Sequence, residues 1–78
     1  MEQMHIMIDS QKTGERIRCA MQEKGYTVKD IMTITGVTSV QAVYKWLYGK
    51  SIPSTETQII LCKVLGFPEN GLIVYHED

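Results

Sequence analysis

Residues 38–53, TSVQAVYKWLYGKSIP, predict a short helix with two different faces. Ser39 is a preferred N-cap residue, and Gly49 can take the left-handed conformation that ends many helices. Between them, three apolar residues recur at spacings of three and four and define an inward face: Val43, Trp46 and Leu47. Trp46 is therefore predicted to anchor the core rather than to stack on a ligand. The other face is polar and aromatic, and it is the first candidate for a binding surface.

A second helix is predicted immediately before this one. Residues 27–36, TVKDIMTITG, begin with Thr27 and Asp30, which have the spacing of a capping box, and end at Gly36. The segment is rich in β-branched residues, so packing rather than helix propensity must stabilise it. Only two residues separate Gly36 from Ser39. Two helices joined by so short a turn have the outline of the helix-turn-helix, whose second helix lies in the major groove of DNA.

In that geometry the first turns of the helix over residues 39–48 face the bases. Gln41 can donate and accept hydrogen bonds at once, which matches adenine, and Lys45 can reach a guanine or a phosphate. Val40 and Ala42 offer only apolar contact, most usefully with a thymine methyl group. The residues predicted to contact bases are Val40, Gln41, Ala42 and Lys45. For each of them taken alone, a solvated surface position is the ordinary alternative.

A further set of residues is predicted to contact the phosphate backbone. Hydroxyl groups donate hydrogen bonds to phosphate oxygens, and lysines neutralise their charge. The set comes from the starts of both helices and from the end of the second: Thr27, Lys29, Ser39, Tyr44, Tyr48 and Lys50. Tyr44 could instead pack over the neighbouring helix.

Two more helices and a turn complete the predicted core. Residues 13–25 are expected to form a helix capped by Thr13 and ended by Gly25. Residues 55–66 are expected to form a helix that starts with Thr55 and Gln58 in capping-box spacing. The inward stripe of the first helix is predicted to be Ile17, Ala20 and Met21. In the second, apolar residues cover most of the circumference, so this helix is expected to lie centrally: Ile59, Cys62 and Gly66 form one row, and Leu61, Val64 and Leu65 widen it. The sequence FPENG at residues 67–71 is read as a turn.

Both ends of the chain resemble strands. Residues 4–8, MHIMI, and residues 72–76, LIVYH, are short β-branched or apolar runs. They could pair with each other or with the ends of a second copy, and a two-stranded ribbon needs packing to be stable. The prediction is an all-α core over about residues 12–70 with strand-like ends, in one domain of 78 residues.

Composition excludes several classes of protein. A hydrophobic fraction of 44% argues against a disordered chain, yet no run approaches the roughly 18 apolar residues of a membrane span. The N-terminal sequence lacks the features of a signal peptide, so a cytoplasmic protein without membrane contact is expected. Cys19 and Cys62 are predicted to be buried free thiols rather than a disulfide or metal ligands.

Charge is unevenly distributed although the formal net charge is −1. Residues 11–50 hold seven basic and three acidic residues, a balance of +4, whereas the first ten residues carry −2 and the last 28 carry −3. A basic middle between acidic ends is what a polyanion-binding face needs, although a solvated helix surface could produce it too.

Catalytic motifs are missing from the sequence. It contains no phosphate-binding glycine loop, no HExxH and no GxSxG. His5 and His76, the only histidines, have no acid or cysteine at ligand spacing, so a metal site between paired end strands is an unfavoured alternative. We therefore expect no enzyme activity, no cofactor and no metal, and infer no small-molecule ligand.

The segments TVKDIMTITGV, SVQAVYKWLYGKSIPS and ILCKVLGF together resemble the Cro/phage-repressor type of helix-turn-helix regulators, the Xre family. The resemblance covers about residues 12–70 and implies a lambda-repressor-like bundle of four to five short helices that binds operator DNA as a homodimer. By position, Ser39 resembles the N-cap of the reading helix, Val40, Gln41 and Lys45 resemble its base-facing positions, and Thr27 resembles the cap of the bracing helix.

Three features depart from the family pattern. Val28 stands where the family usually has a phosphate-binding glutamine. Leu47 stands where it often has a glutamate paired with an arginine of the first helix, which leaves Arg16 and Arg18 without that partner. The segment from Gly36 to Trp46 is also one residue longer than usual, and we assign the extra residue to the turn.

The leading hypothesis is a sequence-specific DNA-binding transcriptional regulator of bacterial, phage or mobile-element type. It would be a dimeric repressor of double-stranded DNA that acts by steric block, since little of the chain is left for an effector domain. The alternative is a protein-interaction module of the same fold, an antitoxin or adaptor that uses its terminal strands to hold a partner.

Overall fold

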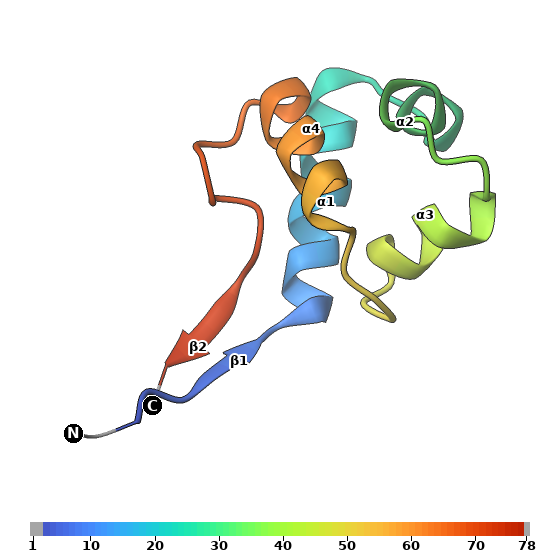
Figure 1. Cartoon of the computed structure of the whole chain (residues 1–78). Helices are drawn as coiled ribbons and strands as arrows, with labels where there is room; N and C mark the ends of the chain where they lie inside the picture. Colours follow the sequence, from blue (N-terminus) through green and yellow to red (C-terminus); the bar gives the residue numbers. More distant parts are fainter. Residues whose placement is uncertain (1–2, 78) are drawn as a thin grey trace.

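The computed structural model describes residues 3–77 of the chain. Its described part is a bundle of four helices with one short antiparallel ribbon, which confirms the predicted fold class. Figure 1 shows the helices gathered together and the two strands projecting from them as an arm. The elements in chain order are β1 (Ile6–Ile8), α1 (Ser10–Lys24), α2 (Val28–Thr35), α3 (Val40–Leu47), α4 (Thr55–Leu65) and β2 (Tyr75–Glu77).

The core lies where the four helices meet. Each helix contributes at least one side chain with no exposed surface, and the segment after α4 adds Leu72. The four helical residues are Ile17, Ile31, Val43 and Leu61. Trp46 is also buried, with 6% of its surface exposed, so its predicted role as a core anchor is confirmed. Burial of such side chains stabilises a fold by about 1.5–3 kcal/mol each.

The first helix starts earlier than the sequence predicted. Asp9, not Thr13, is the N-cap, because its carboxylate accepts a hydrogen bond from the amide of Lys12 at 2.9 Å. Thr13 is instead a buried residue inside α1, whose hydroxyl donates to the carbonyl of Asp9 and accepts from the amide of Val74. A polar residue that is satisfied on both sides in this way can occupy the inward stripe.

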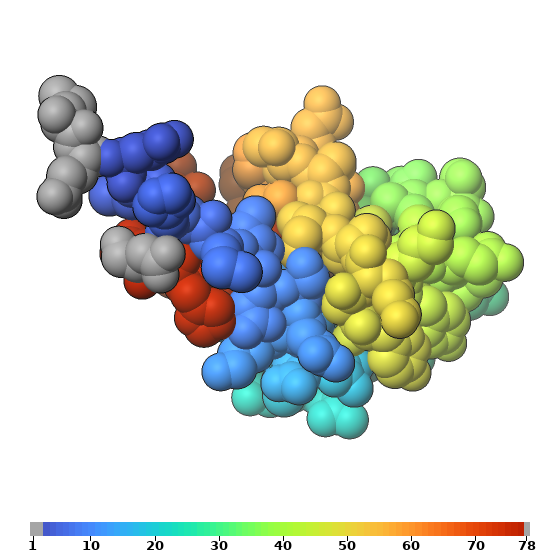
Figure 2. All heavy atoms as spheres, turned by 90° about the horizontal axis from the view of Figure 1, so that it is seen from below, coloured from blue at the N-terminus to red at the C-terminus, as the bar shows by residue number. Residues whose placement is uncertain are grey.

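Helices α1 and α3 approach each other unusually closely. A Cβ atom on Gly14 would lie 2.4 Å from the carbonyl oxygen of Trp46 and 2.6 Å from that of Leu47. Gly49, just after α3, has φ 75° and packs its backbone against Gln11 of α1. In Figure 2 the residues after α3, in yellow, lie directly against the start of α1, in blue. The first turns of α1 therefore set the position of α3.

Two expectations for the outer surfaces of the helices were wrong. Cys19 is exposed, because the inward stripe of α1 runs through Ile17, Ala20 and Met21 and leaves it on the outer side, whereas Cys62 is buried as predicted. Ile59 of α4 was predicted to face inward, yet 53% of its surface is exposed.

The start of α4 also differs by one residue from the prediction. Its N-cap is Ser54, whose hydroxyl accepts from the amide of Thr57 at 3.4 Å, not Thr55. The side chain of Gln58 donates to the carbonyl of Pro53 at 2.8 Å instead of closing a capping box. Gly66 ends the helix in the left-handed conformation, as expected.

The two ends of the chain pair with each other within one molecule. β1 and β2 are antiparallel, with Ile6 opposite Glu77, Met7 opposite His76 and Ile8 opposite Tyr75. The second strand is displaced from the predicted residues 72–76 to Tyr75–Glu77. The reason is tertiary, because Leu72 enters the core and the backbone of Val74 bonds to the start of α1.

Candidate nucleic-acid interface

The first part of the candidate interface is α2, whose start and end are both fixed by capping residues. The capping box at its start is complete, since the Thr27 hydroxyl accepts from the amide of Asp30 at 3.2 Å and the Asp30 carboxylate accepts from the amide of Thr27 at 2.9 Å. Gly36 ends the helix with φ 77°. These local signals stop α2 after Thr35, and its buried Ile31 fixes it against the bundle.

The turn between α2 and α3 comprises residues 36–39, and its length does not disturb the start of α3. Val37 packs against the core, and its amide donates to the hydroxyl of Thr35 at 3.3 Å. Ser39 is the N-cap, as predicted, with its hydroxyl accepting from the amide of Ala42 at 3.3 Å. Val37 thus anchors the turn in the core and α3 starts at its predicted cap, while the assignment of an extra residue to this turn stays a prediction.

The predicted base-contacting residues lie on the outer side of α3. Val40, Gln41 and Lys45 are exposed and Ala42 is half-buried. Figure 1 places α3 at the edge of the bundle, on the side away from the arm. The Ser39 hydroxyl donates to the side-chain oxygen of Gln41 at 3.2 Å, which holds the carboxamide beside the start of the helix. The structure thus places Val40, Gln41 and Ala42 in the first turn of α3 and Lys45 in its last turn; their contact with bases stays a prediction.

The two predicted tyrosines form one stacked unit. The rings of Tyr44 and Tyr48 are 6.0 Å apart between centroids and inclined by 15°. The guanidinium of Arg18, from α1, lies 5.6 Å from the centroid of Tyr48. A cation over an aromatic face is attracted to it by about 0.5–1 kcal/mol at an exposed site. Arg18 is a candidate interface residue that the sequence reasoning missed, since only the close packing of α1 on α3 brings it there.

Lys50 extends the surface beyond the C-terminal end of α3. Its backbone amide donates to the carbonyl of Lys45 at 2.8 Å, and the amide of Ser51 donates to the same oxygen at 3.3 Å. The loop is therefore held against the helix while the Lys50 side chain is exposed. An exposed cation whose backbone is held at this end of α3 is suited to a phosphate contact.

The start of α2 is less suited to binding a phosphate than the corresponding helix start expected from the family pattern. Thr27 and Lys29 are exposed there, as a phosphate contact requires, but Val28 packs partly against the core. The backbone amide of Thr27 lowers the pKa of the Asp30 carboxyl, so this exposed group is charged at neutral pH. A carboxylate beside the first turn repels a phosphate, which leaves Lys29 as the attractive group at this end.

The structure explains why Leu47 stands where the family pattern often has a glutamate, and what Arg16 and Arg18 contact instead of that glutamate. Leu47 is buried in the core, where a glutamate would need a charged partner. Arg16 donates instead to the carbonyl of Gly71, and Arg18 lies over Tyr48. Neither arginine needs a carboxylate from α3.

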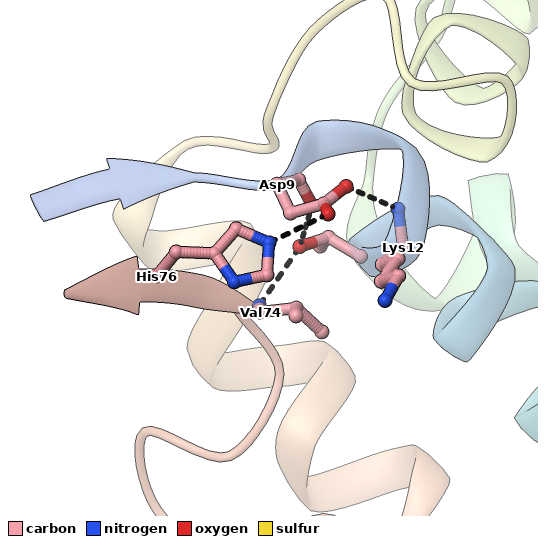
Figure 3. Close-up of polar contacts among 5 residues, drawn as sticks. Asp9, Lys12, Val74 and His76 are labelled. Carbon is pink, nitrogen blue, oxygen red and sulfur yellow. Dashed lines mark hydrogen bonds and ion pairs between the residues drawn. The ribbon is translucent and has the colours of Figure 1, made fainter. Parts of the chain in front are cut away.

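His76, one of the two histidines of the sequence, has a carboxylate as its partner. The ring of His76 lies 2.9 Å from the carboxylate of Asp9, as Figure 3 shows, and His5 is exposed. Residues 3–77 contain no group of three or more histidine, cysteine, aspartate or glutamate side chains that could hold a metal ion. Within the same residues, none of the helices is both long and apolar enough to cross a membrane.

A capped helix, a four-residue turn and a second capped helix with a buried inner face define a helix-turn-helix protein. The family model described as helix-turn-helix, of the Cro/C1 type, matches residues 17–72, so the chain belongs to this Xre-like family of DNA-binding regulators. The resemblance predicted from the sequence is thereby confirmed. No curated protein and no solved structure matches the chain significantly.

Proposed function

We propose that this protein is a sequence-specific transcriptional regulator that acts as a dimeric repressor in the cytoplasm, with α3 in the major groove of its operator. The observation that carries the proposal is the two-sided character of α3. Val43, Trp46 and Leu47 are buried in the bundle, while Gln41 and Lys45 are exposed on the other side. A helix held in this way presents fixed side chains to the edges of bases.

In this proposal base contacts and phosphate contacts divide between two groups of residues. Val40, Gln41, Ala42 and Lys45 would read the bases from the first turns of α3. The surrounding hydroxyl and cationic groups would hold the backbone: Thr27, Lys29, Ser39, Tyr44, Tyr48 and Lys50, with Arg18 added from α1. The positive balance of residues 11–50 supports this division, because phosphate contacts need cations that displace counterions.

The test is DNA binding followed by fluorescence anisotropy on random and genomic duplexes while salt is raised. We expect the affinity of the native chain to fall steeply with salt. Gln41→Ala should lower the preference for the best sequence by about 1–3 kcal/mol per base contact, and Lys45→Ala should weaken binding as well. Lys24→Ala is the matched control, because Lys24 lies near Gly66 at the end of α4. Absence of binding at low salt would refute the proposal.

A second function has specific support. The start of α2 carries the Asp30 carboxylate and the partly buried Val28, neither of which attracts a phosphate, and the arm exposes apolar side chains such as Ile6 and Ile8. Both features suit a protein-interaction module of the antitoxin or adaptor type. This function predicts a folded protein whose weak DNA binding is unchanged by Gln41→Ala, which the same anisotropy experiment measures.

A further inference from the structure

The arm formed by β1 and β2 has one mainly apolar face that is exposed in the single chain. Side chains alternate between the two faces of a ribbon, so the register places Ile6, Ile8 and Tyr75 together with Glu77 on one face and Met7 with His76 on the other. The three apolar residues of the first face are exposed by 54%, 54% and 51%. An isolated two-stranded ribbon is only marginally stable in water, so this face needs a partner.

The same chain carries an apolar groove that continues this face. The groove, of about 700 Å³, runs between α4 and the segment that leads into β2. Its apolar lining includes Ile59, Cys62, Phe67, Leu72, Ile73 and Tyr75. Tyr75 belongs to both the groove and the arm face, so the two form one continuous apolar strip. Ile59, the α4 residue that faces outward against expectation, lies in this strip.

The shape and the charges of the chain favour a second copy as the occupant of this groove. Figure 1 shows β1 and β2 directed away from the bundle, while Tyr75, at the start of β2, still lines the groove. Lys63, the one lysine or arginine after residue 50, lines the groove, and Glu77 is exposed on the arm. A surface that contains both an arm and a groove is self-complementary, as a two-fold symmetric interface requires.

We propose that two copies of the chain dimerise by exchanging their arms, so that the apolar face of each arm lies in the α4 groove of the other copy. The arm exchange names the interface of the dimer in the proposed function, and it depends on that dimer being formed. A stable interface buries about 800 Å² on each partner, roughly a seventh of the 5641 Å² surface of this chain. A reciprocal exchange reaches this buried area more readily than a one-way contact of one arm with one groove, because each copy then buries both its arm and its groove.

The first test is the oligomeric state of the native full-length chain by sedimentation velocity over a range of concentrations. We expect a dimer. Ile59→Glu in the groove and Ile8→Glu on the arm should both give a folded monomer, because each places a charge in the apolar contact while its site is exposed in the single chain. Val40→Glu is the matched control, an exposed apolar residue on α3 whose variant should stay dimeric. Monomeric native protein, or dimeric Ile59→Glu, overturns the proposal.

The second test distinguishes arm exchange from pairing of the two arms edge to edge. In a background of Cys19→Ser and Cys62→Ala, shown by circular dichroism to be folded, one chain carries Ile6→Cys and another carries Ile59→Cys. Arm exchange predicts that a disulfide forms when the two chains are mixed and that neither chain cross-links with itself. Cross-linking of the Ile6→Cys chain with itself would show an arm-to-arm dimer and refute the exchange.

DNA binding by the same variants separates this proposal from the proposed function. A native chain that is dimeric through its arms and binds no DNA leaves the dimer assignment intact and refutes the regulator. A native chain that binds DNA and is monomeric both free and on the duplex refutes the arm exchange and the dimer, but leaves DNA recognition by α3 intact.

Discussion

Replacing Gly14 with alanine would place a methyl group 2.4 Å from the carbonyl oxygen of Trp46 and 2.6 Å from that of Leu47. Ordinary contacts of a Cβ atom begin near 3.4 Å, so α1 and α3 would have to separate by about 1 Å. Both obstacles are backbone atoms of a helix, which cannot rotate out of the way as a flexible side chain can. The substitution therefore tests whether the close approach of these two helices stabilises the fold.

Two effects of opposite sign compete in this substitution. Alanine in a helix interior is favoured over glycine by about 0.5–1 kcal/mol. Overpacking in a close-packed core costs about 1–3 kcal/mol and sometimes more, and two backbone clashes belong at the upper end. The net loss should be about 2 kcal/mol. With a urea dependence of about 1 kcal/mol/M for a small domain, the unfolding midpoint should fall by about 2 M.

The assay is urea unfolding at one fixed protein concentration, followed by circular dichroism and by the fluorescence of Trp46, the only tryptophan. Gln22→Ala, on the exposed side of the same helix, is the control and should change the free energy of unfolding by less than about 0.5 kcal/mol. A Gly14→Ala protein as stable as the native chain, or more stable, would refute the reasoning, because helix propensity alone would then explain it.

Three further predictions concern the caps, the interface and pH. Ser39→Ala removes the N-cap of α3 and should lower the free energy of unfolding by about 1 kcal/mol. Ser39→Asp retains a capping side chain, so its urea midpoint should be unchanged, but the added negative charge should weaken DNA binding. Arg18→Gln should lower the salt dependence of DNA binding by about one unit of log–log slope, and an unchanged slope would place the cation over Tyr48 outside the interface. The amide of Lys12 lowers the pKa of the Asp9 carboxyl below its ordinary 3.8, so the stabilisation from this group is present above about pH 4 and lost as pH falls through the lower folded pKa. In the Asp9→Asn variant the urea midpoint should depend less on pH between pH 5 and pH 3 than in the native chain, when it is measured in steps of about half a pH unit.

The helix-turn-helix could be predicted from the sequence because its signals are local. Thr27 with Asp30, Gly36 and Ser39 are capping residues whose partners lie within four positions, and the structure shows each of them in its expected role. The inward face of α3 was also predicted correctly, since a period of 3.6 residues needs no knowledge of the neighbouring helix. What these signals could not decide is whether Gln41 and its neighbours touch DNA, because that depends on a partner outside the chain.

The errors occurred where distant segments meet. Thr13 and Asp9 are both good N-cap residues, and the choice depends on Val74, which uses the Thr13 hydroxyl from the other end of the chain. The displaced second strand has the same origin, since Leu72 packs into the core. Ile59 was placed inward because it is apolar, although apolar character alone does not say which surface covers a residue. Ile59 lines the groove beside α4 instead.

The first turns of α1 connect the two proposed surfaces of the molecule. On one side, Gly14 brings the backbone of α1 against the carbonyl of Trp46, so the end of α3 is set by helix-to-helix contact. On the other side, Asp9 and Thr13 bond to the backbone of Val74, one residue before β2, at 2.8 and 2.9 Å. Neither connection passes through a flexible loop. If the arms hold the dimer and α3 reads DNA, the first turn of α1 sets the distance between the two α3 helices and hence between the two half-sites. The ends of the chain would then influence which operators are bound without touching DNA.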